Sequence, residues 1–196
     1  MRRRLLLAVL SAGVALLSAG VSDRGSATEA VLPIKFGGPF ALVDHNGDAR
    51  TERDFHGRFM LISFGYTYCP DICPTGLNTM ANALDLLGEK ADRLRPVFVS
   101  IDPGRDTPAV LKEYLAQFHP RLIGLTGAET QVAAAARVYK VHRRKVVLAE
   151  SEGPDDYFVD HSSITYLMGP DGDFVTLFPH GVDAETMAGT LAKYLS

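Results

Sequence analysis

The sequence lacks a strong charge imbalance and internal repeats, and it contains little cysteine. Its 20 Lys and Arg residues and 23 Asp and Glu residues leave a formal net charge of −3. A chain this close to neutral has no strongly charged surface to attract nucleic acid, so we expect no nucleic-acid partner. No low-complexity tract is present either. Only two cysteines occur among 196 residues, which excludes a structural zinc site built from four sulfurs.

A further absence concerns the N-terminal segment, where no cysteine follows the apolar run. Arg2–Arg4 form a basic start, Leu5–Leu17 are apolar or small, and small residues follow, which is the layout of a bacterial secretory signal. Without a cysteine after the run, lipoprotein anchoring is excluded. The run is uniformly apolar, whereas a mitochondrial presequence would be amphipathic. Leu5–Val21 is close to the shortest membrane-spanning helix, so residues 1–21 are either a signal peptide or an N-terminal membrane anchor.

Both alternatives predict export, to the bacterial periplasm or to the periplasmic face of the inner membrane. Residues 22–35 begin as a polar, small-residue stretch and are predicted to form a linker. Residues 36–196 are sufficient for one domain with its own hydrophobic core. Cysteines in an exported chain are oxidised by default. A function that needs free thiols therefore requires a thiol reductant as a partner.

Both cysteines lie in the stretch Tyr66–Gly76, directly after the most apolar run of the predicted domain. A disulfide between Cys69 and Cys73 would close a loop of about five residues and stabilise the fold by roughly 2 kcal/mol. Such a small stabilisation hardly explains two cysteines at the end of a buried strand. The alternatives are two soft sulfur ligands for a metal ion, or one redox-active pair.

The residues beside the cysteines predict how they are presented. A residue before proline is disfavoured in helical conformation, and both Cys69 and Cys73 precede a proline. We therefore predict that Pro74 is the first residue of a helix, that Cys73 is its N-cap, and that neither cysteine lies inside the helix. The positive end of the helix dipole would favour thiolate at this position.

The rest of the domain alternates predicted strands and helices. Phe59–Phe64 and Val97–Ile101 are apolar on both faces, and helical spacing from Thr75 to Gly88 separates them, so we predict two parallel strands joined by a helix. The other predicted elements are a hairpin around Asn46-Gly47, a turn or 3₁₀ segment at Thr51–Phe55, helices from Thr107 to about Phe118, from a Thr126–Glu129 capping box to Tyr139 and from Asp183 onward, and strands at Leu122–Leu125, Val141–Leu148, Ser163–Met168 and Phe174–Phe178. This order predicts an α/β, thioredoxin-like fold with an N-terminal β-hairpin extension and an inserted helix and strand in the 122–140 region.

The spacing of the two cysteines also bears on their chemistry. Three residues separate them, one more than in a thioredoxin-type redox motif. A wider pair can close a disulfide or hold a metal ion, and two thiolates favour a soft ion, Cu(I) first and zinc second.

A third ligand would come from one of six histidines. Five of them stand in predicted turns or in a basic strand: His45, His56, His119, His142 and His180. His161 stands between Asp160 and Ser162, where a predicted loop enters an apolar strand. Asp160 can fix the tautomer of its imidazole, as carboxylates do beside metal-binding histidines. The alternative is a histidine held only by local hydrogen bonds.

Three motifs then resemble the signature of the Sco/SenC family of copper chaperones, and the resemblance covers roughly residues 36–195. The motifs are Phe64-Gly65-Tyr66-Thr67-Tyr68-Cys69-Pro70-Asp71-Ile72-Cys73-Pro74, Ser100-Ile101-Asp102-Pro103 with Arg105-Asp106-Thr107-Pro108, and Val159-Asp160-His161-Ser162-Ser163. The resemblance implies a thioredoxin-like fold that binds one copper ion, Cu(I) or Cu(II), through Cys69, Cys73 and His161. It also implies a role in building the dinuclear copper centre of cytochrome c oxidase.

Two functions follow from these observations. The first is a metallochaperone without turnover, whose partners are the copper-accepting subunit of cytochrome c oxidase, a thiol reductant and an upstream copper donor. The alternative is an enzyme, a thiol-disulfide reductase in which Cys69 and Cys73 form the redox-active pair and His161 is not needed. A peroxiredoxin-type peroxidase is disfavoured, because the residues before Cys69 do not match the sequence around its nucleophile.

Two charged groups have an ordinary structural interpretation. Asp102, Arg105 and Asp106 follow the second predicted strand at the same sheet edge as the cysteines, where they would border the site or a docking surface. Turn capping and a surface ion pair are the favoured interpretation. Arg143, Arg144 and Lys145 can face an acidic partner, although charge runs are usually solvated.

Overall fold

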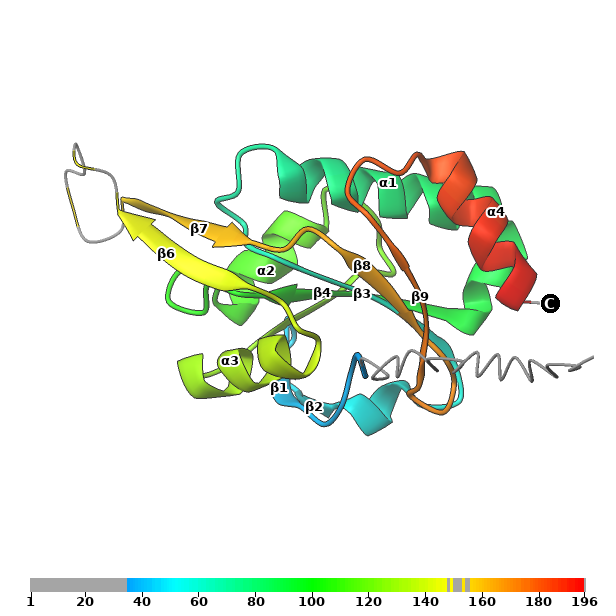
Figure 1. Cartoon of the computed structure of the whole chain (residues 1–196), viewed down its shortest axis with the longest axis horizontal. Helices are drawn as coiled ribbons and strands as arrows, with labels where there is room; N and C mark the ends of the chain where they lie inside the picture. The colour runs from blue at the N-terminus through cyan, green and yellow to red at the C-terminus, as the bar shows by residue number, and fades with distance from the viewer. Residues whose placement is uncertain (1–34, 148, 150–152, 154–155, 196) are drawn as a thin grey trace, which may run out of the picture. The chain divides into compact units, whose positions relative to one another are not determined.

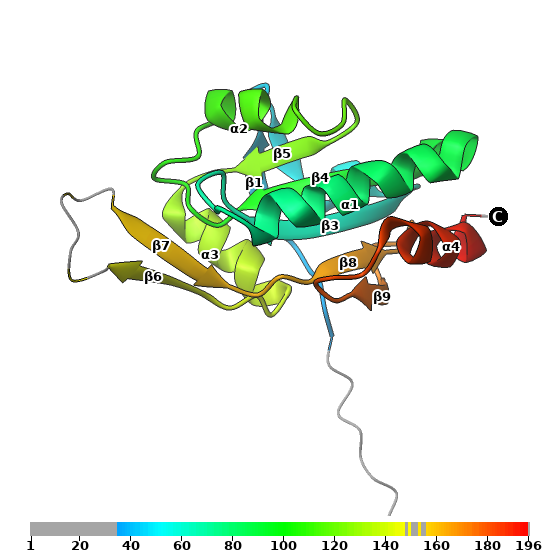
Figure 2. The same ribbon diagram turned by 90° about the horizontal axis from the view of Figure 1, so that it is seen from above.

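The computed structural model describes residues 35–147, 149, 153 and 156–195, which belong to one unit, Ile34–Ser196. Figures 1 and 2 show this unit from two directions. The predicted leader, 1–21, and all of the predicted linker 22–35 except its last residue lie outside the described residues. No helix within the described ranges has the length and apolar character needed to cross a membrane.

Seven of the described strands form one mixed sheet in the order β2-β1-β5-β4-β3-β8-β9. Their bounds are β1 Ala41–Asp44, β2 Ala49–Thr51, β3 Phe59–Gly65, β4 Leu94–Ser100, β5 Ile123–Thr126, β8 Thr165–Met168 and β9 Phe174–Phe178. β3 runs parallel to β4, and β4 runs parallel to β5, whereas the other neighbours are antiparallel. The predicted parallel pair and the N-terminal hairpin of β1 and β2 are both confirmed.

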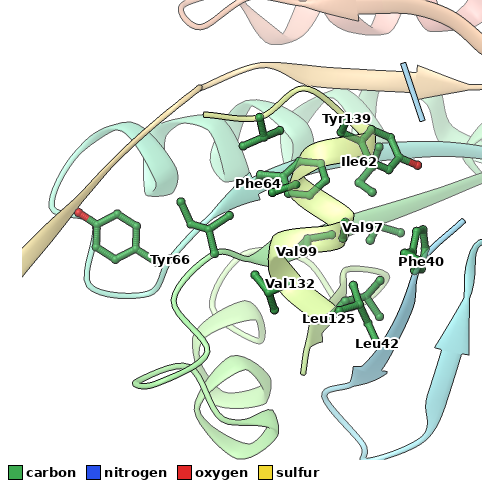
Figure 3. Packing of buried hydrophobic residues seen from close by; sticks show 14 of the residues in the cluster. Phe40, Leu42, Ile62, Phe64, Tyr66, Val97, Val99, Leu125, Val132 and Tyr139 are labelled. Atoms are coloured by element: carbon green, nitrogen blue, oxygen red, sulfur yellow. The ribbon is translucent and has the colours of Figure 1, made fainter. Parts of the chain in front are cut away.

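The four described α-helices cover the two faces of the sheet. They are α1 Ile72–Leu87, α2 Pro108–Leu115, α3 Glu129–Val138 and α4 Ala184–Tyr194, and two 3₁₀ segments, Glu52–Phe55 and Gly88–Arg93, complete the helical elements. Side chains alternate between the faces of a strand, so Leu61 packs with α1, α2 and α4, while Ile62 packs with α3. Figure 3 shows the core cluster that contains Ile62 and the side chains of α3, with Ile62 and Phe64 of β3 among the labelled residues. The thioredoxin-like arrangement of the prediction is confirmed by this architecture.

A second, two-stranded sheet extends from the end of the unit at which α1 begins (Figures 1 and 2). It is a hairpin of β6 (Arg143–Val147) and β7 (Tyr157–His161), paired antiparallel. The loop predicted to lead into the apolar strand at His161 is wrong, because Tyr157–His161 form β7. Tyr157 and Val159 are buried while Phe158 and Asp160 are exposed, so β7 does alternate. Five residues that include a charged one are too short a pattern to recognise without the partner strand.

The predicted helix boundaries are partly wrong. α1 begins at Ile72 with Asp71 as its N-cap, so Cys73 lies inside its first turn. The amides of a first turn have no partner inside the helix, which is why Pro74 is tolerated there despite following Cys73. Thr126, predicted to cap the next helix, belongs to β5, and the N-cap of α3 is Ala128. α2 ends at Leu115, three residues before the predicted end at about Phe118. The predicted Gly88 C-cap and the Thr107-Pro108 helix start are confirmed.

Candidate metal centre

Three side chains from distant parts of the chain meet at one end of the sheet. Cys69 lies in the loop after β3, Cys73 lies in the first turn of α1, and His161 is the last residue of β7. Their ligand atoms all lie within 4.8 Å of one another, and His161 Nε2 is 3.5 Å from Cys73 Sγ. The two cysteines are buried free thiols, 9% and 6% exposed. The structure thus brings together the three residues that the sequence singled out.

The backbone of the cysteine loop accounts for the short distance between the sulfurs. The amide of Cys69 donates to the carbonyl of Tyr66 at 3.2 Å, which turns the chain back at the end of β3. The amide of Cys73 donates to Cys69 Sγ at 3.4 Å. This amide is one of the unpaired donors of the first helical turn, so Cys69 Sγ accepts where a capping side chain would otherwise do so. The positive end of α1 therefore points at the sulfur of Cys69.

The cluster shifts the pKa values of the two thiols in opposite directions. The hydrogen bond from the Cys73 thiol lowers the pKa of Cys69 to about 3. The same bond, together with burial, raises the pKa of Cys73 well above its ordinary value. Burial alone would lower the pKa of His161, but its contacts with Cys69 and with the Ser162 carbonyl raise it overall. One thiolate, one thiol and one imidazole thus share a proton network that a metal ion can replace.

The orientation of His161 directs its Nε2 atom toward the sulfurs. Its Nδ1 lies 2.9 Å from the carbonyl of Ser162 and donates to it, so in the neutral imidazole the lone pair is on Nε2, which lies 3.5 Å from Cys73 Sγ. The prediction that Asp160 orients the ring is wrong. Successive side chains of β7 point to opposite faces, and Asp160 contacts His142 at 3.6 Å and Arg144 at 3.4 Å on the outer face. A backbone carbonyl fills the role assigned to the carboxylate.

The other histidines play different roles. His45 Nδ1 accepts the amide of Gly124 at 2.9 Å, and His119 Nδ1 accepts the amide of Arg121 at 3.1 Å. His180 is exposed and lines the same groove as Cys73 and His161. Within the described ranges it is not part of any cluster of metal-binding side chains.

The acidic residues after β4 are buried, so the favoured interpretation as a surface ion pair is wrong. Asp102 and Asp106 are each 0% exposed. Asp106 accepts the amide of Thr67 at 3.1 Å, the hydroxyl of Thr67 at 2.6 Å and the hydroxyl of Ser100 at 2.6 Å. Burial raises the pKa of Asp106. This carboxyl therefore connects the end of β4 to the cysteine loop. Sequence reasoning missed Thr67 and Ser100 as its partners, because no local pattern marks them.

The basic run on β6 is only partly solvated. Arg143 makes two contacts with Glu129 of α3, at 2.6 and 3.0 Å. Lys145 Nζ lies 4.3 Å from the centre of the Tyr157 ring. Arg144 contacts the exposed Asp160 at 3.4 Å, so all three cations have partners within the protein, which weakens the idea of a free basic face for an acidic partner.

Gly65, the last residue of β3, gives the Cys73 sulfur its space. A Cβ atom at this position would lie 2.5 Å from Cys73 Sγ and 2.9 Å from the ring of Phe98. We expect Gly65→Ala to displace the sulfur and to lower the free energy of unfolding by about 1–3 kcal/mol, the usual cost of overpacking. Urea unfolding measures the second effect. Faster alkylation of Cys73, followed in a Cys69→Ser background, measures the first.

The matched control for this substitution is Gly76→Ala in α1. A Cβ there meets no atom within 4 Å, and alanine is the better helix former by roughly 0.5–1 kcal/mol. This control should keep the alkylation rate and raise the stability slightly. Unchanged alkylation and unfolding in Gly65→Ala would show that the sulfur does not depend on the missing side chain.

Comparisons with known proteins agree with this geometry. The SCO1/SenC family profile matches residues 29–196. A SCO2-like protein of Rickettsia felis is 45% identical over 148 residues, 74% of this chain and 70% of that protein. Protein sco1 of Schizosaccharomyces pombe is 38% identical over 161 residues, 82% of this chain and 61% of that protein. The structure of Bradyrhizobium japonicum ScoI with copper bound has a TM-score of 0.74 and 42% identity, and covers 81% of this chain and 99% of that one. The chain spans only part of the length of the first two relatives.

Proposed function

The chain belongs to the SCO1/SenC family, and from this premise we propose that it is a metallochaperone that binds one copper ion, Cu(I) or Cu(II), through Cys69, Cys73 and His161. The observation that carries the proposal is the convergence of two sulfurs and one imidazole nitrogen within 4.8 Å. The solved ScoI of Bradyrhizobium japonicum, 42% identical, was obtained with copper bound.

The three groups suit copper in both size and chemistry. Metal–sulfur bonds of about 2.3 Å, as for zinc, allow two sulfurs of one ion to lie up to about 4.6 Å apart, which is close to the 4.8 Å within which all three ligand atoms lie. Two thiolates favour Cu(I), and the added imidazole also suits Cu(II). Four protein ligands, as structural zinc requires, are not gathered here among the described residues.

Cargo binding and release follow from the protonation states. Copper enters as a substrate against the Cys69 thiolate, and the proton on Cys73 leaves as the second sulfur binds. Release reverses these steps: an incoming thiolate from the client replaces one sulfur, and a proton returns to Cys73. The copper ion keeps its oxidation state, so no electron changes hands. The groove beside Cys73 and His161, lined also by Ile72 and Ser163, gives the client its approach.

We assign the recipient from the family resemblance and the compartment from the predicted leader. The client is the copper-accepting subunit of cytochrome c oxidase, in whose assembly the family resemblance implies a role. The predicted leader, 1–21, would place the domain in the bacterial periplasm or at the periplasmic face of the inner membrane. A thiol reductant must then keep both cysteines reduced, and an upstream donor supplies the copper.

The decisive experiment mixes the reduced, Cu(I)-loaded protein with a reduced copper-accepting domain of the oxidase. We expect copper to move to the client while the number of free thiols in the chain returns to two, because ligand exchange leaves both sulfurs reduced. Copper is followed by metal analysis after separation, and thiols by alkylation and mass spectrometry.

The competing function is a thiol-disulfide reductase, and it predicts a different outcome. Such an enzyme would reduce an oxidised client with or without copper and would itself become the Cys69–Cys73 disulfide. Copper that stays with the chain when the reduced client is added, together with formation of the Cys69–Cys73 disulfide when the client is supplied oxidised, would defeat the chaperone proposal. The same experiment with His161→Ala should impair metal transfer and leave thiol exchange largely intact.

A further inference from the structure

We propose that Arg105 is a positioning residue that holds the hairpin bearing His161 against the loop bearing Cys69. The part of the test that measures copper affinity rests on the proposed function, whereas the part that measures amide hydrogen exchange in the hairpin does not. The role of Arg105 follows from the residues that it joins, which are Asp102 and aromatic residues of both segments.

The hairpin needs an anchor because it is not part of the large sheet. β6 and β7 pair only with each other in the described part of the chain, and the hairpin extends beyond the end of the main sheet (Figures 1 and 2). His161 is the last residue of β7, while both cysteines belong to the β3–α1 connection. The distance between the imidazole and the sulfurs therefore depends on the short connection from β7 to β8, which pairs with β3, and on side-chain contacts between the hairpin and the cysteine loop.

Arg105 makes such contacts with β7. Its Nη1 donates to the carbonyl of Tyr157 at 3.1 Å, and its guanidinium carbon lies 3.7 Å from the centre of the Tyr157 ring. Its Nε donates to Asp102 Oδ2 at 2.5 Å, and the Tyr157 hydroxyl donates to Asp102 Oδ1 at 2.7 Å. Arg105, Asp102 and Tyr157 thus form a closed ring of contacts. Their side chains are almost completely buried, and burial strengthens charge-assisted hydrogen bonds of this kind.

The same guanidinium also faces the cysteine loop. Its carbon lies 4.7 Å from the ring centre of Tyr68 and 5.8 Å from that of Tyr66, within the range of cation–π attraction. The Tyr66 ring meets the His161 imidazole edge to face, with centroids 5.7 Å apart. Figure 3 shows the ring of Tyr66 apart from the other labelled side chains. One buried cation therefore contacts aromatic rings from both segments that carry the candidate ligands.

The chemistry of this arrangement requires arginine specifically. A guanidinium is planar and can donate to a carboxylate and a carbonyl while it stacks on a ring, whereas a lysine ammonium is a point charge that cannot do all three. Lysine at this position would keep the charge and lose the geometry. This difference separates a positioning role from a simple electrostatic effect of a cation near the site.

The test compares Arg105→Met, Arg105→Lys and Tyr157→Phe with the wild-type chain. Amide hydrogen exchange of the metal-free proteins reports on the hairpin directly, and we expect faster exchange over Tyr157–His161 in all three variants. We also expect Cu(II) affinity to fall by roughly tenfold, the lower end of the 10–100-fold cost of removing an outer partner of a metal ligand. The nitrogen coupling in the EPR spectrum of the Cu(II) form should weaken as His161 loses its place.

The matched control is Arg121→Met, which breaks an exposed ion pair with Asp92 and should change none of these readouts. If Arg105→Met does not fold, because it leaves Asp102 buried without its cation, Tyr157→Phe decides, since it keeps the Arg105–Asp102 pair. The proposal would be overturned if the hairpin amides of these variants exchanged at the wild-type rate. It would also be overturned if Arg105→Lys kept both the wild-type exchange rate and the wild-type Cu(II) affinity. Should the wild-type chain bind no copper, the proposed function fails and the exchange data still decide the role of Arg105.

Discussion

Replacing Cys73 with serine should abolish tight Cu(I) binding. A serine hydroxyl is not ionised near neutral pH and is a hard ligand, so the substitution removes one of the two soft thiolates that Cu(I) prefers. We expect the affinity to fall by more than about 100-fold, because the loss of a mere outer partner already costs 10–100-fold. Competition against a chromophoric Cu(I) chelator measures this change. Cys69→Ser should have an effect of the same order, since both sulfurs lie within the 4.8 Å cluster.

The control for both cysteine variants is Thr75→Ser. Thr75 is an exposed residue of the first turn of α1 and does not belong to the cluster. The Thr75→Ser variant should retain wild-type copper affinity. This result would show that the assay responds to the loss of sulfur rather than to any change in the first turn of α1. A Cys73→Ser protein that still binds Cu(I) as tightly as the wild type would remove Cys73 from the ligand set.

His161→Ala should separate the two oxidation states of copper. The two sulfurs remain and continue to bind Cu(I), whereas Cu(II), the harder ion, loses the ligand that suits it best. We expect Cu(II) affinity to fall by more than about tenfold, with a smaller loss for Cu(I). The absorption and EPR spectra of the Cu(II) form should lose the signature of nitrogen coordination.

His180→Ala is the matched control for this substitution. His180 lines the same groove as His161, yet its side chain is exposed and outside the cluster. It should leave both affinities and both spectra unchanged. If His161→Ala keeps wild-type affinity and spectra for Cu(I) and Cu(II), then His161 is not a ligand and the site consists of the two sulfurs.

Much of the fold was predictable because its signals are local. The two-sided apolar runs of β3 and β4 predicted buried parallel strands, and the helical spacing after Thr75 predicted α1. Gly88 ends α1 with φ of 54°, a conformation that glycine adopts without steric cost. The missed elements are those whose formation depends on distant partners. β7 is stabilised by β6 across the hairpin, and Thr126 caps no helix because its hydroxyl donates to the carbonyl of Asp106.

The features of the candidate site also separate into those predictable from the sequence and those that depend on distant partners. The sequence by itself determined the paired cysteines at the end of a buried strand, the soft-metal chemistry that they favour and, through a family resemblance, the choice of His161. These conclusions need only residue types, their spacing and the chemistry of sulfur.

Only the tertiary structure decided how these groups are held. Cys73 lies inside α1, Ser162 rather than Asp160 orients His161, and Asp102 is buried with Arg105 and Tyr157. Cys73 and His161 are 88 positions apart, and Asp102 and Tyr157 are 55 apart. Local preferences do not specify which side chains meet over such separations. Their meeting is decided when the sheet and the hairpin pack, because a buried charge or hydroxyl is stable only where packing supplies its partner.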